Sequence, residues 1–346
     1  MKKTLLLIAT MLLLAACEKQ IDIDIEYTEP QVVVMSQNNA GNPVSLTLTY
    51  SRPVFGTYYI RNGEDYFQQI TDATATLSVN GTSPITATRT GNTYSFAYTP
   101  QPNDQLNLSI AVPGHKAVTA TATVPHTPSL TNVNFRREST SMHYETYFDS
   151  STVSFTLTDN NATTDYYSIR LRCIDTAVLV KRNYYDSILG YDTVYHDRYL
   201  NFECVDYLIV HNSDLGSLVG GDLDPVSTST YYGDELLFTD AEINGLSHTI
   251  KLSPFSYHYN DSYYDEDYYY EEVYYGEMTE YHAQVILEVT NLTRDLYLFR
   301  QTVDSYSYDD LLGTFTEPVQ IHSNIDGGIG IFGVGILQTS TFHFDD

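Results

Sequence analysis

Tryptophan is absent from this 346-residue chain, and basic side chains are scarce. The 17 lysines and arginines stand against 44 aspartates and glutamates, which gives a net charge of −27. Such a surface repels nucleic-acid phosphates and anionic lipid head groups, so both are poor partners, whereas metal ions and basic protein faces are compatible. The lack of tryptophan also argues against a typical sugar-binding platform, although tyrosine can stack on sugars in its place.

Common catalytic motifs are missing as well. The ten histidines are scattered without a His-Glu-x-x-His motif, and the chain has no Gly-x-Ser-x-Gly elbow. A glycosidase with a pair of catalytic carboxylates stays an open alternative. The pairs themselves carry little information, because 44 acidic residues create chance pairs throughout the chain. Asp159, Asp240 and Asp326 each lie beside turn residues, so we interpret them as turn-forming residues.

No hydrophobic run is long enough to cross a bilayer. The apolar run at residues 4–14 falls far short of the roughly 20 residues required. Because Lys2 and Lys3 precede it and small residues follow it, residues 1–16 are predicted to be an export signal. Leu14-Ala15-Ala16-Cys17 resembles the lipobox of bacterial lipoproteins, which implies cleavage before Cys17 and acylation of that cysteine. An ordinary signal with a chance cysteine is the alternative.

Only three cysteines are present. If Cys17 carries lipid, Cys173 and Cys204 remain as an even pair in an oxidising compartment, and we predict that they form a disulfide. Its loop of about 30 residues would contribute roughly 3 kcal/mol in the chain-entropy model. Two free buried thiols are the alternative. No metal site and no cofactor are expected there, because the cysteines lack Cys-x-x-Cys or His-rich spacing.

The sequence predicts a mainly β protein. Residues 17–30 are predicted to be a lipid-anchored tether, and residues 31–128 an immunoglobulin-like β-sandwich, because turn signals recur there every 8–12 residues or so. Asn80-Gly81 is a strong hairpin signal. Residues 129–346 are predicted to form a larger β-rich domain. The expected strands comprise residues 31–37, 44–50, 73–79, 85–89, 93–98, 106–112, 118–124, 153–158 and 166–173.

One helix is predicted near the C-terminus, at residues 293–309. Its apolar residues recur every three or four positions and therefore share one face. Asn291 or Thr293 is the expected N-terminal cap. Another pair of strands is the alternative for this segment. The residues of the apolar face are Leu292, Leu296, Phe299, Val303 and Tyr306.

Tyrosine is abundant, and it gathers with acidic residues at 183–199 and, more densely, at 257–281. So many carboxylates cannot be buried without partners, so we expect exposed loops or hairpins whose tyrosines bind a partner. The alternative is a solvated hairpin whose alternate tyrosines pack on the domain. Calcium binding by this segment is a weaker possibility, since it lacks the spacing and glycine of an EF-hand. The candidate binding tyrosines are Tyr263, Tyr264, Tyr268, Tyr269 and Tyr270, and the candidate calcium ligands are Asp261, Asp265 and Asp267.

Near the C-terminus, the glycines of Asp326-Gly327-Gly328-Ile329-Gly330-Ile331-Phe332-Gly333 allow close backbone approach within a core strand. A phosphate-binding loop is not expected there, because no Lys or Ser/Thr follows the glycines. Together with several other segments, this motif resembles a Bacteroidota outer-membrane lipoprotein family, domain of unknown function 4249 (DUF4249). The other segments are residues 121–128, 155–159 with 166–167, 237–245 and 315–319.

The resemblance implies a cellular location and a class of partner, but no particular activity. Members look like surface lipoproteins that are often encoded beside TonB-dependent transporters, and acidic residues soon after Cys17 resemble the surface-export signal of such proteins. We therefore expect a non-enzymatic surface lipoprotein that helps a TonB-dependent transporter capture or gate a ligand. A surface hydrolase acting on glycans or peptides is one alternative, and an adhesin or structural surface protein is another.

Overall fold

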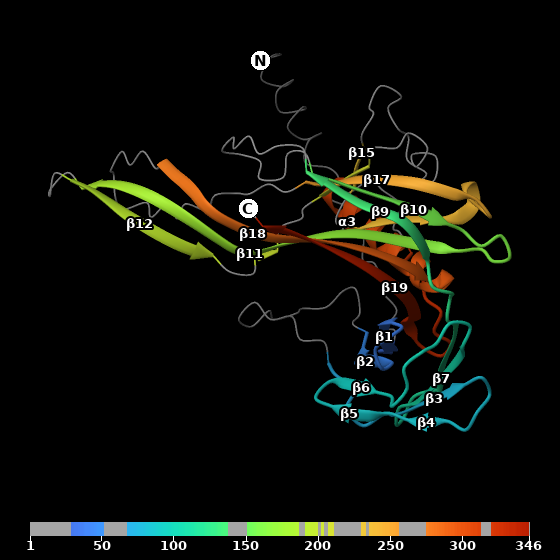
Figure 1. Ribbon diagram of the computed structural model, residues 1–346. Helices are drawn as coiled ribbons and strands as arrows, with labels where there is room; N and C mark the ends of the chain where they lie inside the picture. Colours follow the sequence, from blue (N-terminus) through green and yellow to red (C-terminus); the bar gives the residue numbers. More distant parts are fainter. Residues whose placement is uncertain are drawn as a thin grey trace, which may run out of the picture.

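The chain folds into three β-sheets and one α-helix within the residues that the computed structural model describes (Figure 1). This confirms the prediction of a mainly β protein with a helix near the C-terminus. No described helix has the length and apolar character needed to span a membrane. The described residues are 29–51, 68–137, 151–186, 191–199, 202–203, 207–210, 230–232, 235–255, 275–312 and 320–345.

The largest sheet has ten strands and runs through the whole molecule. β13 (Phe202–Glu203) and β16 (Leu236–Thr239) pair with β11 off the main path. Along that path the order is β12 (Tyr191–Tyr199), β11 (Tyr166–Asp186), β18 (Tyr275–Leu292), β19 (Ile329–Asp345), β1 (Val32–Asn39), β2 (Ser45–Tyr50), β6 (Thr93–Ser95) and β5 (Thr88–Thr90).

Two smaller sheets pack against the two halves of this long sheet. One contains β4 (Ile85–Thr86), β3 (Thr74–Val79), β7 (Gln105–Ala111) and β8 (Val118–Thr123). The other contains β15 (Thr230–Tyr232), β14 (Tyr207–Val210), β17 (Ser247–Phe255), β10 (Ser151–Thr158) and β9 (Ser129–Arg137).

The first hydrophobic core lies between the four-stranded sheet and the β1–β2–β6 part of the long sheet. β7 and β8 alternate strictly between buried and exposed residues, as a two-sided strand requires. The turn after β3 has positive φ at Asn80 (50°) and Gly81 (73°), which confirms the predicted hairpin. Two sheets thus enclose one core here, while the immunoglobulin-like assignment of this region stays a prediction.

The second core lies between the five-stranded sheet and the β11–β16–β18 part of the long sheet. Its largest fully buried side chains include Phe155, Tyr167 and Phe238. β16 and β18 both end beside the start of β11, because Tyr166 pairs with Thr239 of β16 and with Leu292 of β18. The residues just before β11 are therefore brought close to the residues just after β16 and β18.

Strand β19 belongs to both halves of the molecule. Its first part pairs in parallel with β1, from Val33↔Ile329 to Asn39↔Gly335. Its second part pairs antiparallel with β18, from Leu292↔Gly335 to His282↔Asp345. Phe332, Val334 and Ile336 enter the first core, and Ile331 packs beneath the helix. The predicted core strand is confirmed for Ile331 and Phe332, whereas Ile329 is exposed at the start of the strand.

Helix α3 (Arg294–Leu312) lies where residues 293–309 were predicted to be helical. Leu296 and Phe299 are buried with Ile331. The helix packs directly on the β19 backbone, because a Cβ at Gly333 would lie 2.6 Å from Leu296 Cβ.

The side chains expected to cap α3 make other contacts. Thr293 Oγ1 accepts a hydrogen bond from Val334 N (3.3 Å), so this residue joins the helix start to β19. Asn291 Nδ2 donates to Asp165 Oδ1 and to the carbonyl oxygen of His126. The start of the helix is thus fixed by contacts with more distant parts of the chain.

The far end of the long sheet projects away from both cores (Figure 1). We call this projection the β-arm; it consists of β12 and the facing residues 178–186 of β11 and 275–281 of β18. The register places Val194 of β12 and Tyr275 of β18 on either side of Asn183. β12 forms the edge of the sheet.

Candidate functional site

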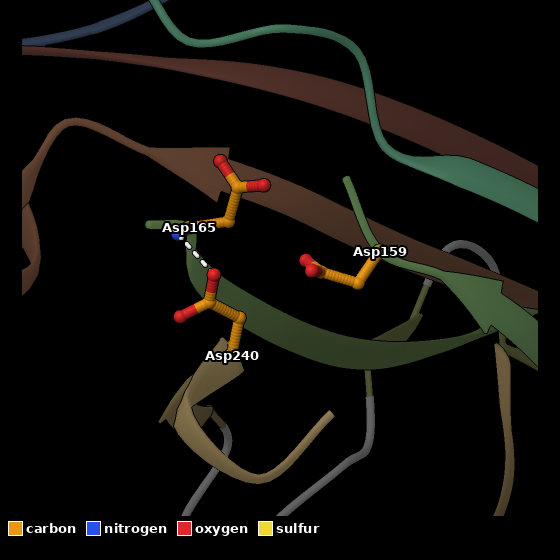
Figure 2. A group of neighbouring side chains, drawn as sticks. All are labelled: Asp159, Asp165 and Asp240. Carbon is orange, nitrogen blue, oxygen red and sulfur yellow. Dashed lines mark hydrogen bonds between the residues drawn. The ribbon is translucent and has the colours of Figure 1, made fainter. Parts of the chain in front are cut away.

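Three buried aspartates meet at the end of the second core (Figure 2). Asp159 follows β10, Asp165 precedes β11, and Asp240 begins the short 3-10 helix η1 (Asp240–Glu242) after β16. One carboxylate oxygen from each residue lies within 4.8 Å of those of the other two. All three residues are nearly inaccessible, with exposed fractions of 6%, 3% and 1%. We call this group the aspartate cluster.

Backbone hydrogen bonds fix two of the three carboxylates directly. Asp165 N donates to Asp240 Oδ2 at 2.9 Å, and Asp240 N donates to the Asp165 carbonyl oxygen at 3.1 Å. Gly245 N donates to Asp159 Oδ2 at 2.9 Å. Gly245 has φ +71° and would carry a Cβ only 2.7 Å from Asn161 Cβ, so the turn needs glycine to approach Asp159.

Polar side chains surround the aspartate cluster. Tyr167, which is fully buried, donates its hydroxyl hydrogen to Asp159 Oδ1 at 2.9 Å. Asn291 Nδ2 donates to Asp165 Oδ1 at 3.1 Å, and Thr163 Oγ1 donates to Asp165 Oδ2 at 3.2 Å. His126, from the segment between the two cores, places Nε2 3.2 Å from Asp165 Oδ2. The cluster therefore connects that segment to β11 and to Asn291 at the end of β18.

Burial controls the electrostatics of the aspartate cluster. It raises the pKa of Asp165, and the charge of Asp159 raises it further, against the opposing effects of Asn291 and His126. Burial likewise raises the pKa of Asp240, with added repulsion from Asp159 and Asp165. Burial and the charge of Asp165 raise the pKa of the Tyr167 hydroxyl, which keeps it a hydrogen-bond donor. Burial and the repulsion among the carboxylates thus both disfavour negative charge within the cluster.

Sequence reasoning found part of this site. Asp159 and Asp240 were interpreted as turn-forming residues, which describes their positions in the chain but not their burial and mutual proximity. Asp326 is exposed, and its backbone forms an isolated bridge with Thr119, outside the aspartate cluster and directly before the turn at Gly327. Asp165 was missed. Its only signal was a place at the end of a polar turn just before an apolar strand.

Most of the site residues proposed from the sequence lie outside the described residues. The disulfide therefore stays a prediction. Ile174 and Glu203, the neighbours of the two cysteines in the sequence, pair with each other on β11 and β13. The residues outside the described part are Cys17, Cys204, the candidate tyrosines Tyr263, Tyr264, Tyr268, Tyr269 and Tyr270, and the candidate calcium ligands Asp261, Asp265 and Asp267.

The β-arm brings together parts of the two tyrosine-rich segments. Residues 191–199 and 275–281 lie on its two outer strands, on either side of β11. Seven of the 25 residues in the arm are tyrosines. The segment that contains the candidate tyrosines at 263–270 leads directly into the arm at Tyr275.

The comparison with protein families gives one match, which covers nearly the whole chain. Residues 18–340 match the model described as Domain of unknown function (DUF4249). No curated protein matches the sequence. The matched region includes the aspartate cluster, the β-arm and most of β19. The chain therefore belongs to the DUF4249 family.

Proposed function

We propose that this protein is a lipoprotein anchored to the outer membrane through acylated Cys17, facing outward, and that it helps a TonB-dependent transporter capture its ligand without catalysing a reaction. The observation that carries the recognition part of this proposal is the β-arm. It projects from the two cores and joins segments that are rich in tyrosine (Figure 1). Tyrosine is enriched in recognition surfaces because it adds a large rigid contact area with a polar tip.

The charge of the protein suggests the nature of the partner. With a net charge of −27, the chain would be attracted to a basic protein face and repelled by another acidic one. Such attraction mainly speeds association and selects among partners, while buried aromatic contacts supply affinity. A basic face on the transporter or its cargo is therefore the proposed binding partner of the β-arm and the adjoining residues 257–274.

A surface hydrolase is the competing function, because carboxylates do meet in the aspartate cluster. A glycosidase needs its two carboxyl groups on either side of a bound sugar, about 5–10 Å apart. The three aspartates of the cluster lie closer together, are at most 6% exposed, and are bound to neighbouring donors. The arrangement supports a structural or ion-binding role better than hydrolysis.

The anchor can be tested with Cys17→Ala. Acylation at this cysteine should be lost, so the variant should appear unprocessed or in the periplasmic fraction, and surface staining should fall at least tenfold. Stable anchoring needs more than one acyl chain, and the variant would lack the cysteine that carries them. Fractionation of cells with antibody staining measures the outcome, and Ser83→Ala, a change at an exposed residue far from Cys17 in the sequence, is the control variant. A Cys17→Ala protein that remains fully at the cell surface while the exposed-site control Ser83→Ala behaves like the wild type would contradict the proposed anchor.

The recognition surface can be tested by replacing Tyr268, Tyr269 and Tyr270 with serine. Aromatic residues at an interface contribute about 1–3 kcal/mol each, so recovery of the transporter in pull-downs from outer membranes should fall more than tenfold. The melting temperature should change little. Leu246→Ser is the matched control, because it removes an exposed apolar side chain elsewhere. Unchanged recovery, or loss of folding in the triple variant, would favour simple packing of the tyrosines on the domain.

A further inference from the structure

We propose that the aspartate cluster formed by Asp159, Asp165 and Asp240 is a calcium-binding site, separate from the proposed transporter partnership. Each of the three side chains offers a carboxylate oxygen, and these oxygens lie within 4.8 Å of one another. Calcium binds oxygen ligands at about 2.3–2.6 Å, so oxygens on opposite sides of one ion are separated by roughly 4.8 Å. The three carboxylates therefore have the spacing of ligands to a single ion.

A buried polar atom that lies beside the carboxylates and lacks a hydrogen-bond partner gives independent support for a bound cation. Asn291 is fully buried, and its Oδ1 has no hydrogen-bond partner. The amide group reaches the cluster, because its Nδ2 lies 3.1 Å from Asp165 Oδ1. Rotating the amide by half a turn exchanges its oxygen and nitrogen. In an empty site that orientation would set Asn291 Oδ1 against Asp165 Oδ1 and the His126 carbonyl oxygen, but with a cation bound there Oδ1 would be a neutral fourth ligand.

The charge of the site also requires compensation. Three carboxylates are almost completely buried together. The ion pair recorded for them among the described residues is with His126, whose Nε2 lies 3.2 Å from Asp165 Oδ2. Burying several carboxylates without positive charge is strongly unfavourable. A divalent cation bound by the three carboxylates would supply that positive charge.

The ligand chemistry favours calcium among the common metals. Carboxylate and amide oxygens suit Mg²⁺, Ca²⁺ or Mn²⁺, whereas zinc and copper sites usually contain imidazole or thiolate. Calcium tolerates irregular geometry, while magnesium needs a near-ideal octahedron and keeps several waters. The hydrogen bonds from Tyr167 to Asp159 and from Asp165 N to Asp240 hold these carboxylates in place. Extracellular calcium modules bind with dissociation constants of about 0.1–1 mM, which suits a chain with an export signal.

An ion at this position would join parts of the chain that are distant in sequence. Asp159 ends a strand of the five-stranded sheet, and Asp165 begins a strand of the long sheet. Asp240 follows β16, and Asn291 lies at the end of β18, two residues from Thr293 at the helix start. Calcium would thus close the end of the second core where its two sheets meet.

Calcium titration of the full-length lipoprotein in detergent tests the proposal. After treatment with EDTA and dialysis at pH 7.5, calorimetry with CaCl2 should reveal one site with a dissociation constant of about 0.1–1 mM. Thermal unfolding in 10 mM CaCl2 should shift upward by about 3–6 °C relative to EDTA. A NaCl solution of equal ionic strength should not reproduce the shift, because screening alone does not fill the site.

Asp240→Asn provides the decisive comparison. Without calcium, this variant should unfold at a temperature equal to or above that of the wild type, because a buried charge has been removed. In 10 mM CaCl2 the order should reverse, because the variant has lost a charged ligand. Asp326→Asn, which removes an exposed turn carboxylate, should behave like the wild type in both conditions. Asp159→Asn gives the same test if Asp240→Asn does not fold.

Two results would overturn the calcium site. One is a wild-type protein whose calorimetric and thermal titrations show no calcium effect beyond that of NaCl. The other is an equal calcium-dependent shift in the wild type, the Asp240→Asn or Asp159→Asn variant, and the Asp326→Asn control. The second result would assign calcium binding to acidic groups elsewhere on the chain.

Discussion

Deletion of residues 329–346 should abolish the cooperative unfolding transition and leave little folded protein. The deletion removes β19, which supplies the strand between β18 and β1. It takes Phe332, Val334 and Ile336 from the first core and Ile331 from beneath the helix. Full burial of one large apolar side chain is worth about 1.5–3 kcal/mol, so the loss of these four side chains, roughly 6–12 kcal/mol, is comparable to the whole stability of typical domains, about 5–15 kcal/mol. Circular dichroism during thermal unfolding measures the result.

A short deletion provides the control for this experiment. Removal of residues 345–346 takes away only the last register pair of β19, Asp345 with His282. Its melting temperature should remain within a few degrees of the wild type, since one terminal pair adds little. A cooperative, near-native transition in the long deletion would show that the two cores do not depend on β19.

Gly330→Ala should destabilise the protein by about 3 kcal/mol or more, through backbone strain and a steric clash. Gly330 has φ +114°, a conformation that residues with a side chain rarely adopt. Its added Cβ would lie 2.0 Å from the carbonyl oxygen of Val34, which is paired with Gly330 in the β1–β19 ladder. Because the added Cβ is held by the backbone of residue 330 and the Val34 oxygen is itself a backbone atom, the clash can be relieved only if the two strands move apart. Chemical denaturation measures the change in unfolding free energy.

Gly41→Ala separates the two contributions. Gly41 has a similar φ of +105°, but an added Cβ there would have no atom within 4 Å. This variant should lose about 1–2 kcal/mol, from backbone strain alone. If Gly330→Ala costs no more than Gly41→Ala, the close approach of β19 to Val34 is not a constraint on the fold.

The features that the sequence predicted correctly depend on short-range patterns. The hairpin at Asn80-Gly81 follows from two adjacent residues that accept positive φ. Helix α3 follows from apolar residues spaced by three or four positions, of which Leu296 and Phe299 are buried. Each pattern spans only two adjacent residues or a few helical turns, so it can be recognised in the sequence without knowledge of the tertiary structure.

The aspartate cluster could not be predicted in the same way. Asp159 and Asp240 are far apart in the sequence, and each stands beside ordinary turn residues. They meet because β11 begins beside both Thr239 and Leu292, which sets Asp165 against Asp240. That register depends on the complete sheet. Likewise, Asn291 was expected to cap the helix, but its amide group instead contacts Asp165 and His126 from distant parts of the chain.

The shared strand β19 also constrains when the protein can fold. Asn38 Nδ2 donates to the carbonyl oxygen of Gly333, across a sequence separation of 295 residues. During synthesis from the N-terminus, the edge of β1 that pairs with β19 therefore stays unpaired until almost the entire chain has been made. Contacts of such long range slow folding, and an open strand edge favours association with other chains. Folding of the N-terminal half is consequently a late event, completed only after the final residues arrive.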